Sequence, residues 1–217
     1  MSTREVDQAK ELCQAVLAAT VALENAQDEL CRLDSVAGDG DEGLSMARAA
    51  RAVRERLVSE CPSSVTDVVE VAASELAAVG GAMGALSYVV LSAIGEDLKA
   101  RGASGLSAWR LAQLLAVAEA AVSDFGGAKR GDKSVLDAIG AARDTAEKSA
   151  DANATTLEVL RAAAEAARRG AEATASMEAR VGRASRLAAR SVGAVDAGAQ
   201  SFAVVLGALA DAYTSQV

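Results

Sequence analysis

Apolar residues recur at helical spacing along most of the chain. Between residues 5 and 30 they are three or four positions apart and therefore share one face of a helix: Leu12, Val16, Ala19, Leu23, Ala26 and Leu30. No segment shows the convincing alternation of apolar and polar residues that marks a β-strand. Similar patterns predict further helices over about 44–59, 64–78, 84–99, 105–124, 134–150, 155–178 and 196–213.

Glycine-rich polar segments separate these helices. The longest cover residues 37–43 and 126–133, a glycine turn covers 80–84, and the helical pattern weakens near Val181-Gly182-Arg183. None is long enough to be a linker between domains. We therefore expect residues 1–217 to form a single all-α domain, a bundle or barrel of about eight antiparallel helices.

The composition indicates a core of small side chains. Apolar residues make up 51% of the chain but aromatic residues only 2%, so the interior must be built from Ala, Leu and Val. Small side chains let helices approach closely, which favours packed helices over a β-sandwich. The single proline, Pro62, leaves long stretches free to be helical.

Charge and residue content exclude several classes of function. With no histidine in the chain, a His-bound zinc site and a Ser-His-Asp triad are impossible. The net charge of −8, without a strong Lys/Arg cluster, argues against nucleic-acid binding. An acidic protein that binds a polyphosphate needs local positive charge, which a divalent cation usually supplies. The three cysteines lack metal-ligand spacing and are expected to be reduced thiols.

One segment resembles a membrane span. Residues 76–95 carry no charge and include a GxxxG at Gly80 and Gly84. Four glycines and two serines in this stretch favour two buried helices joined by a turn instead. The charged N-terminus has no apolar signal-peptide region, so we expect a cytoplasmic protein without a membrane partner.

The strongest chemical signal is the acidic segment 34–43. Asp34, Asp39 and Asp41 fall within eight residues of a glycine-rich loop, where their unpaired charges repel one another. Mg²⁺ prefers a few carboxylates together with phosphate oxygens and water, and would relieve this repulsion. A solvated acidic turn explains the segment equally well. An EF-hand is excluded because no Glu stands at position twelve counted from Asp39.

Three further segments are weaker signals. Gly80 to Gly84 precedes an apolar helix, whose free N–H groups could bind an anion, although glycine also serves ordinary helix turns. In Gly131-Asp132-Lys133-Ser134, either Ser134 or Asp132 could simply cap the next helix. Arg183 stands where the helical pattern lapses and could face a ligand or solvent.

Together, these segments resemble the nucleotide-binding L subunit or domain of the dihydroxyacetone kinases in order and spacing. The family pattern has a Leu-Asp step, then G-D-x-D-H-G, G-G-A-S-G, G-D-K-T, G-R-A-S, S-x-G and D-P-G-A. The matching residues here are Leu33-Asp34, Gly38 to Gly43, Gly80 to Gly84, Gly131 to Ser134, Gly182 to Ser185, Ser191 to Gly193 and Asp196 to Ala199.

The resemblance implies a helical barrel with ATP or ADP at one end. It implies that Asp34, Asp39 and Asp41 hold two Mg²⁺ ions, and that Asp39, Asp41 and Arg183 act in phosphoryl transfer. Residues near the nucleotide would be Gly80, Gly81, Ala82, Met83, Gly84, Gly131, Asp132, Ser134, Arg183, Asp196 and Gly198.

The resemblance also implies a kinase whose small hydroxy-ketone substrate is bound by a separate K-type subunit. The phosphoryl donor would be ATP or a phosphocarrier protein that recharges bound ADP. Three residues depart from the family pattern: Glu42 replaces its His, Met83 its Ser and Ala197 its Pro. The first two fall at the phosphate end, so a catalytically weak binding or regulatory protein is the alternative.

Overall fold

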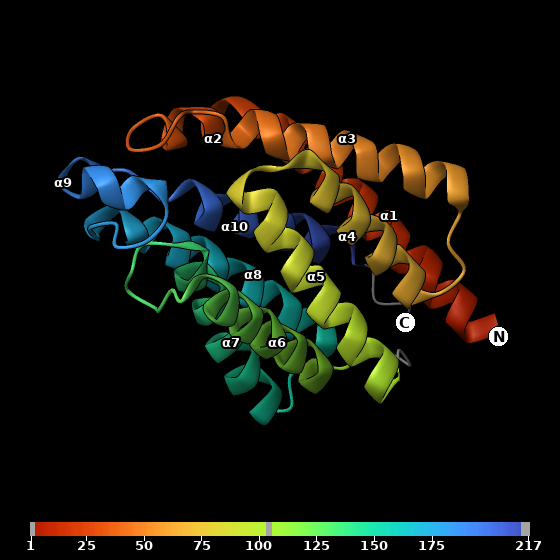
Figure 1. Ribbon diagram of the computed structural model, residues 1–217. Coiled ribbons are helices and arrows are strands. Elements are labelled where there is room, and N and C mark those ends of the chain that lie inside the picture. Colours follow the sequence, from red (N-terminus) through yellow and green to blue (C-terminus); the bar gives the residue numbers. More distant parts are fainter. Residues whose placement is uncertain (1–2, 103–105, 214–217) are drawn as a thin grey trace.

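The computed structural model describes residues 3–102 and 106–213, in which all regular secondary structure is helical (Figure 1). The long helices are α1 (Thr3–Asn25), α3 (Glu42–Glu60), α4 (Val65–Val79), α5 (Gly81–Arg101), α6 (Ala108–Gly126), α7 (Val135–Asp151), α8 (Thr156–Ala173) and α10 (Ala197–Ala212). Shorter elements are α2 (Gln27–Asp34), α9 (Ala188–Ser191) and two 3₁₀ turns, Thr174–Ser176 and Arg183–Leu187.

The eight long helices form a closed ring. Each packs against the next in the order α1, α3, α4, α5, α6, α7, α8 and α10, and α10 returns to pack against α1. This is the helical barrel that the periodicity and the family resemblance predicted. Figure 1 shows the loop after α2, the loop after α6 and α9 at one end of the molecule, and the start of α1 at the opposite end.

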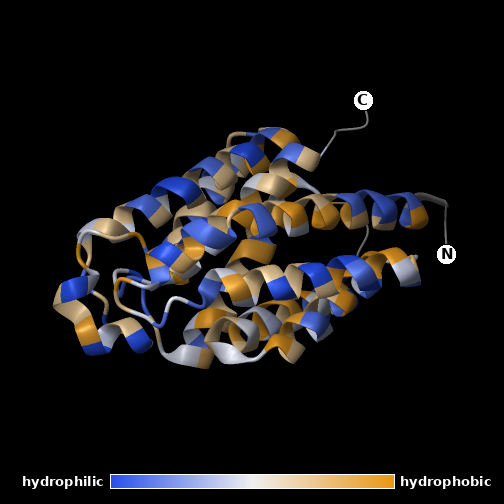
Figure 2. Ribbon diagram, turned by 90° about the horizontal axis from the view of Figure 1, so that it is seen from above, coloured by the Kyte–Doolittle hydropathy of each residue, from blue (hydrophilic) through white to orange (hydrophobic). Residues whose placement is uncertain are grey.

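The core consists mainly of alanine, with leucine and valine filling the wider spaces. Small residues are required where backbones nearly touch. A Cβ on Gly170 in α8 would lie 2.7 Å from the carbonyl oxygen of Asp137 in α7. Hydrophobic and hydrophilic residues are interspersed along the helices, and hydrophilic residues are frequent in the loops at one end (Figure 2).

The structure refines three of the predicted helix boundaries. The helix expected over 5–30 is interrupted at Ala26, next to the point where Gly43 of α3 comes so close that a Cβ would lie 1.9 Å from the Gln27 carbonyl oxygen. The helix expected over 155–178 ends at Ala173. The glycine turn is limited to Gly80 and Gly81, both with positive φ, and α5 already includes Ala82 to Gly84.

No helix in the described ranges is both long and apolar enough to cross a lipid bilayer. The uncharged stretch 76–95 is instead divided between the end of α4 and the first part of α5.

Candidate functional site

The acidic loop, residues 34–41, is shaped around the side chain of its first residue, Asp34. Asp34 ends α2, and its carboxylate oxygen Oδ2 accepts hydrogen bonds from the backbone N–H groups of Gly40 at 2.7 Å and Asp41 at 3.1 Å. Gly38 lies so close that a Cβ there would be 2.1 Å from Asp34 Oδ1. Gly40 has a φ of +78°, a conformation that glycine adopts without strain.

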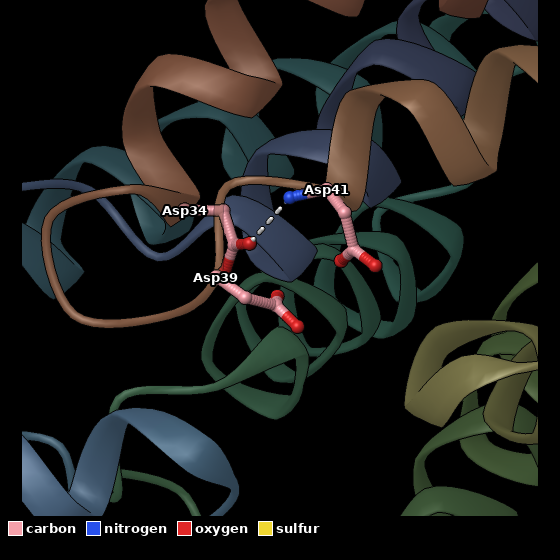
Figure 3. Close-up of side chains that lie close together, drawn as sticks. All are labelled: Asp34, Asp39 and Asp41. Carbon is pink, nitrogen blue, oxygen red and sulfur yellow. Dashed lines mark hydrogen bonds between the residues drawn. The ribbon is translucent and has the colours of Figure 1, made fainter.

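This arrangement brings three carboxylates together. Asp34, Asp39 and Asp41 each offer an oxygen that lies within 4.8 Å of the other two (Figure 3). Opposite ligands of an octahedral Mg²⁺ are about 4.2 Å apart, since each Mg–O bond is about 2.1 Å. Small side-chain rotations would therefore let the three oxygens converge on a divalent cation. The structure thus brings together all three residues that the sequence predicted as metal ligands.

Arg183 contacts the same cluster from a distant part of the chain. Its guanidinium forms an ion pair with Asp39, and both side chains are about half exposed. Within the described residues, no basic side chain pairs with Asp34 or Asp41. Arg183 begins a 3₁₀ turn directly after Gly182, whose φ is +66°. The sequence predicted this lapse in the helical pattern, and the segment 174–196 contains only short helical turns separated by irregular chain.

Glu42 differs from its acidic neighbours because it is buried. It lies in the first turn of α3, is 9% exposed, and accepts a hydrogen bond of 3.0 Å from the Ser201 hydroxyl of α10. Burial raises the pKa of the Glu42 carboxyl to about 7, and the negative charges of Asp34, Asp196 and Asp41 also raise it. Glu42 thus occupies an interhelical contact inside the barrel mouth.

The glycine turn before α5 leaves that helix without a side-chain cap. The cap position is Gly80, which has no side chain, and Gly80, Gly81 and Ala82 are all exposed. The first N–H groups of a helix carry a partial positive charge and bind anions when no side chain occupies them. The side chain of Met83 is half-buried and packs toward Gly198 of α10, where a Cβ would lie 3.2 Å from Met83 Sδ.

The scaffold loop, residues 127–134, uses its polar groups internally. The Asp132 carboxylate accepts from the Lys129 N–H at 2.8 Å, and the Asp137 carboxylate accepts from the N–H groups of Gly131 and Ser134 at 2.6 and 2.8 Å. Ser134 caps α7. The capping role that the sequence allowed for Ser134 is therefore present, whereas Asp132 holds its own loop.

Asp196 is the N-cap of α10 and accepts a 2.8 Å hydrogen bond from the Ala199 N–H. Burial raises the pKa of the Asp196 carboxyl to about 6, an effect that the nearby ammonium of Lys133 partly opposes. Asp34, Gly38, Lys133 and Asp196 line one cavity of about 30 Å³ behind the acidic loop. The motif Asp196 to Ala199 therefore begins next to the acidic loop.

Two features of this end have no counterpart among the sequence predictions. The Glu42–Ser201 contact joins residues 159 positions apart, and Lys133 is buried with partners 41 and 61 positions away. Lys133 belongs to a motif that the sequence singled out, but its burial had no visible signal. A larger groove of about 330 Å³, between α8 and α10, contains none of the predicted site residues.

Comparisons with known proteins identify the family of this chain. The DAK2 domain model matches residues 36–211. The chain is 36% identical over 209 residues to a D-erythrulose kinase from Mycolicibacterium smegmatis, covering 95% of this chain and 36% of that protein. It is 35% identical over 191 residues to the triokinase/FMN cyclase of Homo sapiens, covering 87% of this chain and 32% of that protein.

A solved structure has the same fold. The dihydroxyacetone kinase from C. freundii in complex with AMP-PNP and Mg²⁺ superposes with a TM-score of 0.73 at 27% identity, covering 93% of this chain and 33% of that one. The chain thus spans about a third of the length of these relatives. The match to the DAK2 model over most of the chain confirms the family resemblance read from the sequence, and the chain belongs to the DAK2 domain family.

Proposed function

We propose that this chain binds a magnesium adenine nucleotide at the acidic end of the barrel and delivers its phosphoryl group to a small hydroxy-ketone held by a K-type partner. The observation that carries the proposal is the clustering of Asp34, Asp39 and Asp41, which offer carboxylate oxygens within 4.8 Å of one another. It is supported by relatives named as kinases of erythrulose and triose, and by the C. freundii kinase, whose structure is a complex with AMP-PNP and Mg²⁺.

The three aspartates would together hold two Mg²⁺ ions. Carboxylate oxygens are the ligands that Mg²⁺ prefers, and Asp34 and Asp41 have no competing basic partner among the described residues. Bound Mg²⁺ would supply charge neutralisation for the phosphates and for the transition state. Asp34 fixes the loop through its two backbone hydrogen bonds, so it would act as the central ligand.

The phosphate chain would lie between the acidic loop and the start of α5. Residues 80–84 offer uncapped backbone N–H groups there, and Met83 can contribute only its N–H because its side chain packs toward Gly198. Arg183 already pairs with Asp39, so its guanidinium could move by a side-chain rotation to a phosphate oxygen. We assign Arg183, Asp39 and Asp41 to the transfer step on this basis.

The adenosine end would be enclosed by the second half of the site. Gly131, Asp132 and Ser134 lie in the scaffold loop, while Asp196 and Gly198 lie at the start of α10. Their polar side chains are largely engaged within the protein. They would therefore contribute shape and backbone groups, and the side chains would supply little direct hydrogen bonding.

The partner would dock at this same end. Four large apolar side chains next to the site are 40–54% exposed: Leu44, Phe125, Leu187 and Val192. Exposed apolar groups that surround a polar site favour contact with another protein surface. We propose that a K-type subunit or domain covers them when it presents its substrate. A phosphocarrier protein that recharges bound ADP would use the same opening.

The alternative is a DAK2-type protein with weak catalysis and a regulatory or docking role. It is favoured by Met83 and Glu42, which replace a hydroxyl and an imidazole of the family pattern. Turnover separates the two functions. The isolated chain should not phosphorylate dihydroxyacetone, whereas addition of a cognate K-type subunit should restore phosphorylation if the kinase proposal is right.

Nucleotide binding itself is tested by calorimetry with ADP in the presence of Mg²⁺ and then of EDTA. We expect binding only with the cation, because three clustered carboxylates repel a polyphosphate. Equal affinity in EDTA would overturn the metal-clamp part of the proposal. An absence of binding in both buffers would overturn nucleotide binding by the isolated chain.

A further inference from the structure

Lys133 is a charged residue in a nearly dry environment. Its side chain is 4% exposed, and its ammonium donates to the carbonyl oxygens of Thr174 and Ala194, each at 2.6 Å. Its backbone has a φ of +58°, a conformation that non-glycine residues rarely adopt. A buried charge and an unfavourable backbone conformation both cost stability, so their presence at one residue favours a functional reason.

The two carbonyls accepting from Lys133 mark the ends of the strap, which we define as residues 174–196. Thr174 follows α8, and Ala194 stands two residues before the N-cap of α10. Between them the chain forms only short helical turns. A single ammonium therefore ties both ends of the strap to the scaffold loop before α7.

Other contacts hold the strap in the same place. The Thr174 hydroxyl accepts from the Asp196 N–H at 2.8 Å, the Gly193 N–H donates to the Ala175 carbonyl at 2.8 Å, and the Arg180 N–H donates to the Asp132 carbonyl at 3.0 Å. Each of these contacts is one hydrogen bond between neutral groups. Lys133 supplies two charge-assisted bonds, which are the stronger kind.

Two residues proposed to face the nucleotide depend on the strap. Arg183 lies near its middle and reaches Asp39, and Asp196 ends it at the start of α10. Lys133 lines the cavity behind the acidic loop, on the side of Asp34 and Asp196. From this buried position Lys133 can hold the strap in place without contacting a nucleotide bound at the acidic loop.

We propose that Lys133 is a positioning residue, which holds the strap so that Arg183 meets the acidic loop in a fixed orientation. This inference rests on the proposed function and adds to it a residue outside the predicted nucleotide set. Lys133 would act through Arg183 and touch neither the nucleotide nor the cation.

The test compares Lys133→Met with Lys129→Met. Both variants lose one lysine charge from the same loop, but Lys129 is exposed and only Lys133 has its ammonium on the strap. Calorimetry with Mg-ADP should show about ten-fold or greater loss for Lys133→Met and less than about two-fold for Lys129→Met, since small displacements of binding groups have large effects. Amide hydrogen exchange should accelerate within 174–196 and stay unchanged in α3 and α7.

A double-mutant cycle distinguishes positioning from general destabilisation. Arg183→Gln should weaken Mg-ADP binding in the parent but have much less effect in Lys133→Met. In Lys133→Met the arginine is already displaced, so its contribution to binding is already small. Additive losses would overturn the proposal, as would unchanged affinity in Lys133→Met. If Lys133→Met fails to fold, the same cycle with Lys133→Gln, which keeps a donor, decides the question. If the parent binds no nucleotide, the proposed function fails, and the exchange comparison alone still tests the tie to the strap.

Discussion

The acidic loop and the scaffold loop are both glycine-rich, polar and located at the same end of the barrel, but they treat their polar groups in opposite ways. In residues 127–134, carboxylates accept backbone N–H groups, Ser134 caps a helix, and Arg130 pairs with Glu119 and Asp144. In the acidic loop only Asp34 is used in this way, and Asp41 has no side-chain partner in the described part of the chain.

The difference indicates which loop is built for an external ligand. Unpaired charges cost stability in a folded chain, so a cluster of them has to be maintained for another reason. A loop whose polar groups already have partners gives up binding capacity and gains rigidity. We therefore assign the binding chemistry to residues 34–41 and a supporting role to residues 127–134.

The largest effect is expected from Asp34→Asn. The variant keeps a side-chain oxygen for the Gly40 N–H but loses the charge that the cations require. We expect Mg-ADP affinity to fall by about 100-fold or more, since charge-assisted contacts are worth about 1.5–3 kcal/mol each. Calorimetry measures this, with Asp124→Asn as an exposed control at the same end. Similar small losses in both variants would contradict the assignment of Asp34 as the central ligand.

Asp196→Asn tests how a buried carboxyl beside Lys133 of the scaffold loop makes stability depend on pH. Burial raises the Asp196 pKa from 3.8 to about 6, so the folded protein keeps a proton that the unfolded chain has lost between these values. Stability therefore falls as pH rises through this window. Asparagine can keep the cap on the Ala199 N–H without a charge. At pH 7.5 the variant should be more stable by up to about 3 kcal/mol, because one pKa unit is about 1.4 kcal/mol.

Denaturant unfolding of the metal-free protein at pH 4 and pH 7.5 measures this effect as the difference between variant and parent. Carboxyls that do not interact with Asp196 titrate alike in both proteins and cancel in that difference. Glu42 does not cancel, because the charge of Asp196 helps to raise its pKa; losing that charge lowers the Glu42 pKa and adds to the stabilisation at pH 7.5. A variant less stable than the parent at pH 7.5 would mean that ionised Asp196 is a needed partner of Lys133.

Glycine substitutions should separate binding from stability in the two loops. In Gly38→Ala the new methyl would lie 2.1 Å from Asp34 Oδ1 and displace that carboxylate, so Mg-ADP affinity should fall about ten-fold. In Gly131→Ala the methyl meets open space, but the φ of +88° is strained for alanine, so stability should fall by about 1 kcal/mol. Thermal melts and calorimetry on both variants measure the two effects. The comparison would be undone if Gly131→Ala impaired binding more than Gly38→Ala.

Most of the fold was predictable because the signals are local. Each helix has apolar residues at helical spacing, and most loops between helices are marked by glycines. The interruption at Ala26 had no signal in the sequence, since alanine favours helices and the close approach of Gly43 to the adjacent backbone comes from another helix. The clustering of the proposed metal ligands was also predictable, because Asp34, Asp39 and Asp41 lie within eight residues. The burial of Lys133 and the Glu42–Ser201 hydrogen bond could not be predicted from the sequence. These contacts join residues 41 to 159 positions apart, which only the closed barrel brings together.

The smallest expected effect concerns the two exposed aspartates in the metal-free protein. Asp39 pairs with Arg183, whereas no basic side chain in 3–102 or 106–213 forms an ion pair with Asp41, which lies close to Asp34 and Asp39. Asp41→Asn should therefore relieve repulsion and raise stability by about 0.5 kcal/mol, while Asp39→Asn loses an ion pair and gains the same relief, for little net change. Denaturant unfolding in low salt would measure this, and the difference should shrink in about 0.5 M NaCl, where the Debye length is about 4 Å. Both variants should bind Mg-ADP less tightly than the parent. If both instead destabilise the metal-free protein, the carboxylates are partners within the fold, and the acidic loop would no longer differ in kind from residues 127–134.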